Sequence, residues 1–299
     1  MAAARAGSLV VHVATIAYRG VTRVAATIRH DAVKQSATRM AHPQAIIARM
    51  GMHPLDATYA VVDVETTGFD RNRDRVVEVA CVVVRGGIEV RAFSSLVNPG
   101  LPIPVRATEV HHITDAHVAG APAIDEVAPI LQRMCAGAIV VAHNATFDRG
   151  FLPMLADHPS LCTLRLARHV FPELQSHANQ ALRHALDVAL PSDPGEAHRA
   201  FSDARVTAAI LDVLLERYLR MGYPADADAL LAFAKSKITF PRFPFGRYRN
   251  VPLPQVPGDY LQWMLRCSDP PFDEDICTTA TAELRRRSRS YREPASKAV

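Results

Sequence analysis

Short apolar runs separated by polar turns dominate the chain from residue 59 to residue 97. Tyr59 to Gly68 reads Tyr-Ala-Val-Val-Asp-Val-Glu-Thr-Thr-Gly, a largely apolar run that ends in two carboxylates, as in a buried strand with a charged end. Val76 to Val84 and Ile88 to Val97 are two more apolar runs, and Arg85-Gly86-Gly87 between them predicts a hairpin turn. The pattern predicts three consecutive strands.

Helical spacing of apolar residues follows further along the chain. Ala123 to Cys135 has this spacing and precedes the apolar strand Ala138 to Ala142. Two helices are predicted at about residues 165–170 and 179–186, and a long amphipathic helix begins close to His198. A helix between strands predicts a crossover connection and an α/β layer.

Composition divides the chain into five parts. We expect a poorly specified basic extension, a main α/β domain, a linker, a small C-terminal α+β module and a disordered basic tail, at residues 1–55, 56–222, 223–237, 238–287 and 288–299. Residues 1–30 contain four arginines and no carboxylate. That composition is typical of an organellar transit peptide, and a start site placed too early would also produce it.

Hydropathy, cysteine usage and charge limit the class of protein. No apolar run approaches the ~18 residues of a membrane helix, so no membrane anchor is expected. The five cysteines never form a Cys-x-x-Cys pair, which favours a reducing compartment over disulfides or zinc. We expect a cytoplasmic protein, or an organellar one if the extension is a transit peptide. Residues 59–222 are net acidic between basic flanks, which suits a polyanionic partner, although ordinary solubility charge gives the same pattern.

Asp63 and Glu65 are the first candidate functional residues. Side chains on a strand repeat every second residue, so both carboxylates point to one face. Two anions this close repel each other unless a positive charge lies between them. The sequence therefore predicts a divalent metal site at the end of this strand.

Three more candidates lie where strands or loops lead into helices. Asn144 and Thr146 are plausible caps for a helix that begins near Phe147, which would place Asp148 in its first turn. His198 and Asp203 open the long amphipathic helix. Taken singly, each acid could instead serve the helix dipole, and the histidine could be an ordinary surface residue.

Taken together, these residues resemble the DnaQ-like 3′ to 5′ exonucleases with a DEDDh active site. Asp63-Val-Glu65-Thr-Thr-Gly matches their first motif, Asn144-Ala-Thr-Phe147-Asp148 their second, and His198 with Asp203 their third. The resemblance covers about residues 59–220. It implies an α/β fold with an RNase H-like mixed β-sheet flanked by helices.

The resemblance also implies a mechanism. Two Mg²⁺ or Mn²⁺ ions would be held by Asp63, Glu65, Asp148 and Asp203, with Asp63 bridging both ions and Asp148 holding the second. Carboxylate oxygens are the ligands that Mg²⁺ prefers. His198 would be the general base, since an imidazole can accept a proton at neutral pH.

The same resemblance assigns a substrate pocket. Thr66, Thr67 and Gly68 would meet the 3′-terminal nucleotide, and Asn144 and Phe147 would line the pocket for its base. His111 falls where the family has a His-Gly pair, and His112 replaces the glycine.

The C-terminal module resembles the segment that ends exodeoxyribonuclease X and its relatives. Phe243-Pro-Phe-Gly-Arg-Tyr-Arg-Asn250 departs from their Phe-Gly-Lys-x-x-Gly pattern, because Arg247 and Asn250 replace the lysine and the last glycine. Arg247 and Arg249 alternate with aromatic residues, as expected for contact with an unpaired strand. Alternatively, the rings are simply the core of the module.

The expected function is a metal-dependent exodeoxyribonuclease that releases nucleoside 5′-monophosphates in repair or end trimming. Its expected partner is DNA with a free 3′ end, and single-stranded DNA is the expected preference. RNA is the competing substrate. A proofreading subunit of a DNA polymerase, an exoribonuclease and a non-catalytic DNA-binding scaffold are the competing interpretations. Homodimer formation and association with a polymerase are left open.

Overall fold

The computed structural model describes residues 12–14, 25–27, 51–190, 198–267 and 274–292. Contacts divide the chain into two compact units. The first comprises the chain to Leu166 together with Ala178–Ala234, and the second comprises Ala167–His177 together with the chain from Lys235 onward. None of the described helices is long and apolar enough to cross a membrane.

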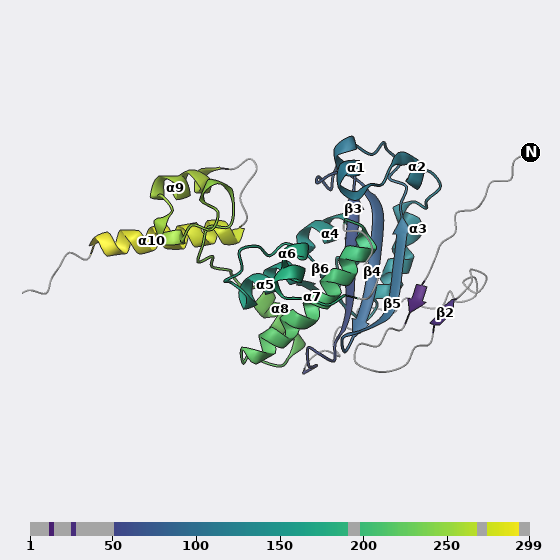
Figure 1. Ribbon diagram of the computed structural model, residues 1–299, viewed down its shortest axis with the longest axis horizontal. Helices are drawn as coiled ribbons and strands as arrows, with labels where there is room; N and C mark the ends of the chain where they lie inside the picture. Colours follow the sequence, from purple (N-terminus) through teal and green to yellow (C-terminus); the bar gives the residue numbers. More distant parts are fainter. Residues whose placement is uncertain (1–11, 15–24, 28–50, 191–197, 268–273, 293–299) are drawn as a thin grey trace, which may run out of the picture. The chain divides into compact units, whose positions relative to one another are not determined.

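A five-stranded mixed sheet forms the centre of the first unit (Figure 1). Its strands are β3 (Thr58–Thr66), β4 (Val76–Arg85), β5 (Ile88–Leu96), β6 (Ile139–Ala142) and β7 (Ser160–Cys162), in the order β5-β4-β3-β6-β7. The pairs β3–β4 and β4–β5 are antiparallel, whereas β3–β6 and β6–β7 are parallel.

The three consecutive strands predicted from the sequence are confirmed. Gly86 and Gly87 connect β4 to β5 with φ angles of 57° and 71°, the left-handed conformation that a tight hairpin turn requires. The predicted strand at residues 138–142 corresponds to β6. The short strand β7 was not predicted.

Separately, β1 (His12–Ala14) and β2 (Ala25–Thr27) pair as an antiparallel two-stranded sheet. The rest of the expected extension up to residue 50 lies outside the described residues.

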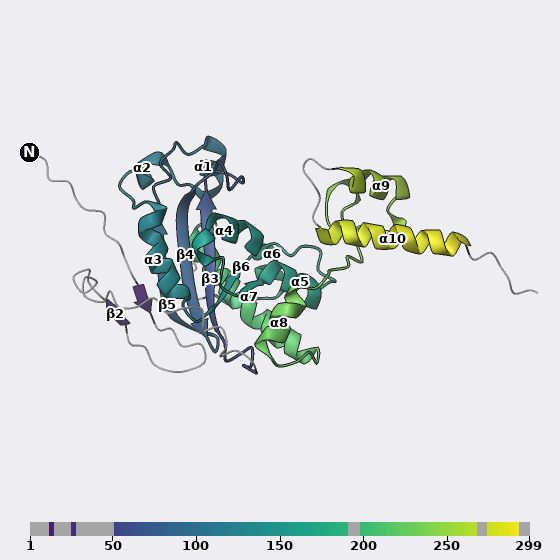
Figure 2. The ribbon, with the colours of Figure 1, turned by 180° about the vertical axis from the view of Figure 1, so that it is seen from behind.

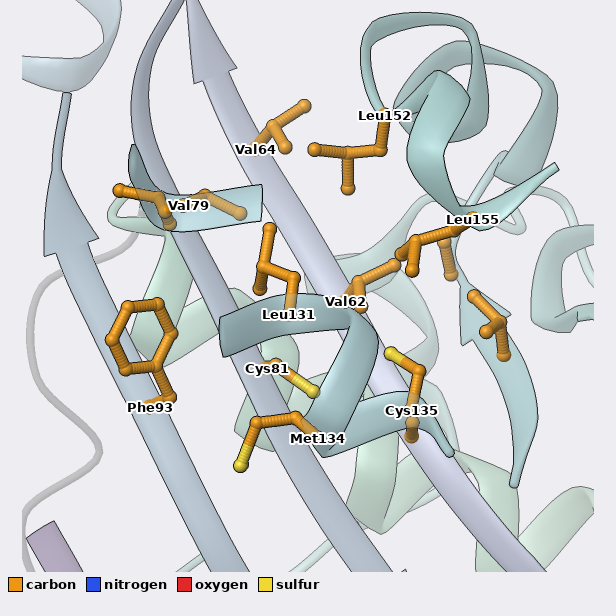
Figure 3. Packing of buried hydrophobic residues seen from close by; sticks show 14 of the residues in the cluster. Val62, Val64, Val79, Cys81, Phe93, Leu131, Met134, Cys135, Leu152 and Leu155 are labelled. Carbon is orange, nitrogen blue, oxygen red and sulfur yellow. The ribbon is translucent and has the colours of Figure 1, made fainter. Parts of the chain in front are cut away.

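One face of the central sheet is packed with apolar side chains beneath α3 (Ile124–Cys135) (Figure 3). Alternate residues of β3 point into this core, because strand side chains alternate between faces. Among its members are Val62, Val64, Val79, Cys81, Phe93, Leu131, Met134, Cys135, Leu152 and Leu155.

The long helix α7 (Ala200–Arg220) packs on β3 and β4 (Figures 1 and 2). Since Val62 and Val64 point into the α3 core, the alternation of β3 puts Asp63 and Glu65 on the opposite face. α7 buries a stripe of residues at helical spacing, which includes Val206, Ile210, Leu211, Leu214, Leu215 and Tyr218.

The other helices of the first unit flank this framework. They are α1 (Val105–His111), α2 (Asp115–Val118), α4 (Ala145–Phe151), the 3₁₀ turn η3 (Pro153–Leu155), α5 (Thr163–Val170), α6 (Asn179–Ala185) and α8 (Ala227–Lys235). α5 begins in the first unit and ends in the second. The predicted helices at residues 165–170 and 179–186 correspond to α5 and α6.

Two element boundaries differ from the sequence expectation. α4 begins at Ala145, two residues before the predicted start, and its N-cap Asn144 makes no side-chain capping hydrogen bond. The expected linker at residues 223–237 contains α8, because Ala227, Leu230, Leu231 and Ala234 lie at helical spacing and are buried. The first unit therefore extends to Ala234.

The second unit has its own apolar core. Its described elements from residue 246 are the 3₁₀ turns η4 (Gly246–Tyr248) and η5 (Leu253–Gln255), followed by α9 (Gly258–Arg266) and α10 (Glu274–Arg292). Within the described residues of this unit, β-pairing is limited to a bridge between Arg242 and Pro252, so the expected α+β module is mainly helical. α10 continues into the expected tail as far as Arg292. The core comprises Ile238, Phe240, Phe243, Leu253, Val256, Leu261, Met264, Ile276 and Ala280.

Candidate active site

A cluster of carboxylates lies at the end of β3. Asp63 and Glu65 come from β3, and Asp203 comes from the first turn of α7. One side-chain oxygen of each residue lies within 4.8 Å of those of the other two. The fold thus brings together three acids that are up to 140 residues apart in the chain.

Asp148 lies at the same end of β3. It belongs to the first turn of α4, and its side chain is buried. Its Oδ1 accepts a hydrogen bond from the backbone N–H of Val64 at 3.3 Å, one residue from Asp63. Burial raises the pKa of Asp148 to about 7, although hydrogen bonds from backbone N–H groups oppose this shift.

Burial and mutual repulsion raise the pKa values of the strand carboxylates. Burial is the main cause of the strongly raised pKa of Asp63, and the charges of Asp148 and Asp203 add to it. Burial likewise raises the pKa of Glu65 to about 8, with Asp203 as the next contribution. A bound cation would relieve this repulsion, and a divalent metal ion suits these oxygen donors. The residues present therefore fit a divalent metal centre.

Two hydrogen bonds fix the carboxylate of Asp203. Gln180 on α6 donates from Nε2 to Oδ1 at 2.9 Å, and the backbone N–H of His198 donates to Oδ2 at 2.9 Å. On the neighbouring residue of α6, Nδ2 of Asn179 donates to the backbone carbonyl of Asp203 and to Oγ1 of Thr207. The start of α7 is therefore tied to α6.

His198 lies two residues before α7 and has an exposed side chain. Its φ angle is 60°, a left-handed conformation that is uncommon outside glycine. This backbone conformation accompanies the hydrogen bond to Asp203, so the imidazole projects from a backbone that is tied to the carboxylate cluster. The loop expected at residues 191–195 lies outside the described residues.

An ion pair between Glu78 and Arg199 adjoins the cluster. Glu78 on β4 is directly opposite Glu65 on β3. Both Glu78 oxygens accept hydrogen bonds from the Arg199 guanidinium, at 2.7 and 3.1 Å, and Oε2 also accepts the backbone N–H of Ala200 at 2.9 Å. The pair neutralises a fifth carboxylate and fastens the start of α7 to the sheet. The sequence patterns did not single out these two residues or Gln180.

The turn after β3 is closely hydrogen-bonded. The hydroxyl of Thr66 donates to the carbonyl of Gly68, and that of Thr67 donates to Asp74 at 3.2 Å. A Cβ at Gly68 would lie 2.5 Å from an Asp74 oxygen, so the turn excludes a side chain there. The next residue, Phe69, has 90% of its surface exposed. An apolar ring this exposed, next to the turn in sequence, is a candidate contact for a bound ligand that the sequence patterns did not reveal.

The other predicted substrate residues differ in exposure and are divided between the two units. The Phe147 ring lies 6.2 Å from that of Phe69, and Asn144 is exposed at the start of α4. His111 is buried, and its Nδ1 accepts the N–H of Ile113. Burial lowers the pKa of His111. Arg247 and Arg249 belong to the second unit.

Comparison with known proteins identifies the family of the first unit. The family model RNase_T, described as "Exonuclease", matches residues 60–211, a range that contains Asp63, Glu65, Asp148, His198 and Asp203. The "DNA polymerase III subunit epsilon" of Aquifex aeolicus is 38% identical over 170 residues, which are 54% of this chain and 82% of that protein.

Two other similar proteins differ from this chain in length. The "DNA polymerase III subunit epsilon-like protein" of Rhodobacter capsulatus is 39% identical over 60% of this chain, which spans 26% of that protein. The solved structure "Exonuclease X in complex with 5' overhanging duplex DNA" is 32% identical, covering 59% of this chain and 99% of the other, with a TM-score of 0.48. From the family match and the Aquifex relative, the chain belongs to the RNase_T exonuclease family, as the DnaQ-like motifs predicted.

Proposed function

We propose that this chain is a metal-dependent 3′ to 5′ exonuclease that hydrolyses DNA and releases nucleoside 5′-monophosphates. The observation that carries the proposal is the convergence of Asp63, Glu65 and Asp203 within 4.8 Å, with Asp148 and an exposed histidine beside them. Membership of the exonuclease family supports the reaction class.

In this proposal, Asp63, Glu65 and Asp203 would hold one Mg²⁺ or Mn²⁺ ion, and Asp148 would help to hold a second. Such ions supply positive charge for the phosphoryl transition state and make water a better nucleophile. The raised pKa values of Glu65 and Asp148 support this role, because a cation would replace the protons that these carboxylates otherwise retain.

The protein residues supply the remaining chemistry. His198 takes a proton from the attacking water, whose oxygen forms a bond to phosphorus. The bond from phosphorus to the 3′ oxygen of the preceding nucleotide breaks, and that oxygen takes up a proton from solvent water, while the protonated His198 returns its proton to solvent. The products are a nucleoside 5′-monophosphate and a strand that is one nucleotide shorter, with a new 3′ hydroxyl.

The strand end is proposed to lie on the turn after β3. Thr66, Thr67 and Gly68 offer backbone groups to the 3′-terminal nucleotide. Phe69 and Phe147 offer two neighbouring rings, 6.2 Å apart, to its base, which suits stacking. Asn144, which is exposed at the start of α4, and the buried His111 are the other residues proposed to contact this nucleotide.

A proofreading subunit is the second candidate function. It is favoured by the similarity to the Aquifex protein, which is named a subunit of DNA polymerase III. Co-purification of the full chain with a DNA polymerase would support it, whereas a repair or end-trimming role fits a free-standing enzyme. An exoribonuclease and a non-catalytic DNA-binding scaffold are distinguished from both by the substrates that the chain degrades.

Digestion of matched oligonucleotides tests the proposal and separates a DNA exonuclease from an exoribonuclease and from a non-catalytic scaffold. DNA and RNA of one sequence, single- and double-stranded and labelled at the 3′ end, are incubated with Mg²⁺ or with a chelator. We expect rapid Mg²⁺-dependent release of label from single-stranded DNA. Faster release from RNA would favour the exoribonuclease. No release from any substrate, with DNA still bound, would favour the scaffold.

A further inference from the structure

Three aromatic rings form a row in the second unit, and we call Trp263, Tyr260 and Tyr248 the aromatic row. The ring centroids of Trp263 and Tyr260 lie 5.3 Å apart, and those of Tyr260 and Tyr248 lie 4.7 Å apart. Tyr260 also contacts the buried Phe243, at 5.6 Å and nearly edge-on. Tyr248 and Tyr260 pack against the core of the unit, whereas Trp263 is half exposed.

Trp263 is not needed to form that core. The buried face of α9 is formed by Leu261 and Met264, whereas Trp263 lies between them in sequence and keeps 49% of its surface exposed. It is also the only tryptophan in the chain. Leaving half of an indole in water forgoes much of the burial energy that a large ring can provide. The exposed half of the indole is therefore available for contact with a ligand.

Positive charge accompanies the aromatic row. The Arg247 guanidinium lies 5.6 Å from the centroid of the Tyr248 ring, and Arg242 and Arg249 are exposed in the same loop. Glu283, an acid of the same unit, does not neutralise these arginines, because it pairs with Arg286 and Arg287. Asp259 on α9 is an exposed counter-charge. The loop that holds Tyr248 therefore carries three arginines.

We propose that the aromatic row is a binding site for an unpaired nucleic-acid strand, with bases stacked on the rings and phosphates held by Arg247 and Arg249. Stacking on aromatic rings together with cationic contacts to the backbone is how proteins hold single strands without reading sequence. An acidic peptide would satisfy the arginines but would leave the flat ring surfaces unused. The inference rests on the proposed function, because the strand is then the nuclease substrate itself.

Fluorescence of the single tryptophan tests this directly. The full-length Asp63→Ala variant, in chelator, is titrated with a 15-nucleotide oligo(dT) and with an abasic strand of the same length. Base stacking on Trp263 should quench its emission saturably with oligo(dT) but not with the abasic strand. Equal quenching by both strands, or no quenching while fluorescence anisotropy of a labelled strand shows binding, would overturn the proposal.

Variants separate the rings from the charges. Trp263→Ala should weaken oligo(dT) binding at least about fivefold, the lower end for loss of one stacked base, whereas Trp263→Phe should retain most of the affinity. Replacing Arg247 and Arg249 together by alanine should reduce the salt slope of binding by about 1.4. Arg133→Ala removes an exposed arginine of α3, in the first unit, and is the control for the loss of one positive charge. Unchanged affinity in Trp263→Ala would overturn the proposal.

Two further outcomes separate strand binding from self-association and the binding site from the nuclease activity. A change in Trp263 emission with protein concentration alone, accompanied by a dimer in sedimentation, would assign the row to contact between copies and overturn strand binding. Nuclease activity of the wild-type chain is measured separately. Strand binding at the row without any Mg²⁺-dependent hydrolysis would therefore refute the proposed function while leaving the binding site intact.

Discussion

The backbone N–H of His198 donates a hydrogen bond to Oδ2 of Asp203, with a donor–acceptor distance of 2.9 Å. This bond joins the proposed base to a proposed metal ligand through the main chain. The other oxygen of Asp203 accepts a hydrogen bond from Gln180. Both oxygens of the carboxylate are thus oriented by residues that do not themselves belong to the cluster.

Gln180→Leu should weaken metal binding without removing a ligand. Loss of its hydrogen bond frees one oxygen of Asp203 to rotate, and outer residues of this kind typically contribute about 10- to 100-fold in metal affinity or activity. The Mn²⁺ affinity is measured by calorimetry and compared with that of Gln132→Leu, an exposed glutamine on α3. Equal affinities of the two variants would show that Gln180 does not position Asp203.

Arg199→Ala should reduce both stability and activity, whereas Arg205→Ala should reduce stability alone. Each arginine makes a bidentate ion pair with a glutamate of the sheet. Arg199 pairs with Glu78, and Arg205 pairs with Glu89. Loss of either leaves a largely buried carboxylate without its partner, at a cost of about 3 kcal/mol. Only Arg199 adjoins His198.

Denaturant unfolding and turnover per folded molecule measure the two effects. In the Arg199→Ala background, Glu78→Gln should restore part of the stability, because the unpaired charge is removed. Equal loss of turnover in Arg199→Ala and Arg205→Ala would contradict a specific role of the Glu78–Arg199 pair at the site.

His198→Asn should lower the rate of hydrolysis by about 10²- to 10⁴-fold at neutral pH. Asparagine tolerates the left-handed conformation at residue 198 better than alanine does, so the backbone bond to Asp203 should persist. Part of the rate should return at high pH, where hydroxide replaces the missing base. A single-turnover pH profile identical to the wild type would remove His198 from the mechanism.

Asp212→Asn should stabilise the protein at neutral pH but not at low pH. Burial, with the nearby Glu216 charge, raises the pKa of Asp212 on α7 to about 6, above its value of about 4 in an unfolded chain. The folded wild type therefore loses stability as pH rises from about 4 to about 6 and does not regain it above that range.

The stabilisation by Asp212→Asn should reach about 3 kcal/mol at pH 8 and vanish below about pH 4. Urea unfolding at a series of pH values in chelator measures it, with the exposed Asp157→Asn as the matched surface control. A stability difference that does not change with pH would show that Asp212 titrates alike in the folded and unfolded chains.

The central strands and the acids at their ends could be predicted because their signals are local. Asp63 and Glu65 are two residues apart on an apolar strand, so alternation alone places them on one face. The Arg85-Gly86-Gly87 turn fixes the hairpin that holds β4 and β5. The convergence of Asp203 with these acids depends on long-range packing, and only its family motif indicated it.

Residues whose roles depend on distant partners were missed. Gln180 acts through Asp203, which is 23 residues away, and Glu78 acts through Arg199, which is 121 residues away. A signal for Glu78 existed, since it is the only acid in the apolar run of β4. β7 has only three residues, too few to show a period. α8 lies within the expected linker, although its apolar residues are spaced as in a helix.

The most direct test of the proposed nuclease is the polarity of digestion. A single-stranded DNA of about 30 nucleotides is labelled at its 5′ end; this length exceeds the binding site of a typical single-strand binding domain. It is incubated with Mg²⁺ and either the wild-type chain or Asp63→Ala. The wild type should give a ladder of labelled strands that shorten one nucleotide at a time, with nucleoside 5′-monophosphates as the released product, and the variant should give none. Immediate release of the 5′ label as a mononucleotide, or an equal rate in the variant, would contradict a 3′ to 5′ exonuclease built on the Asp63 cluster.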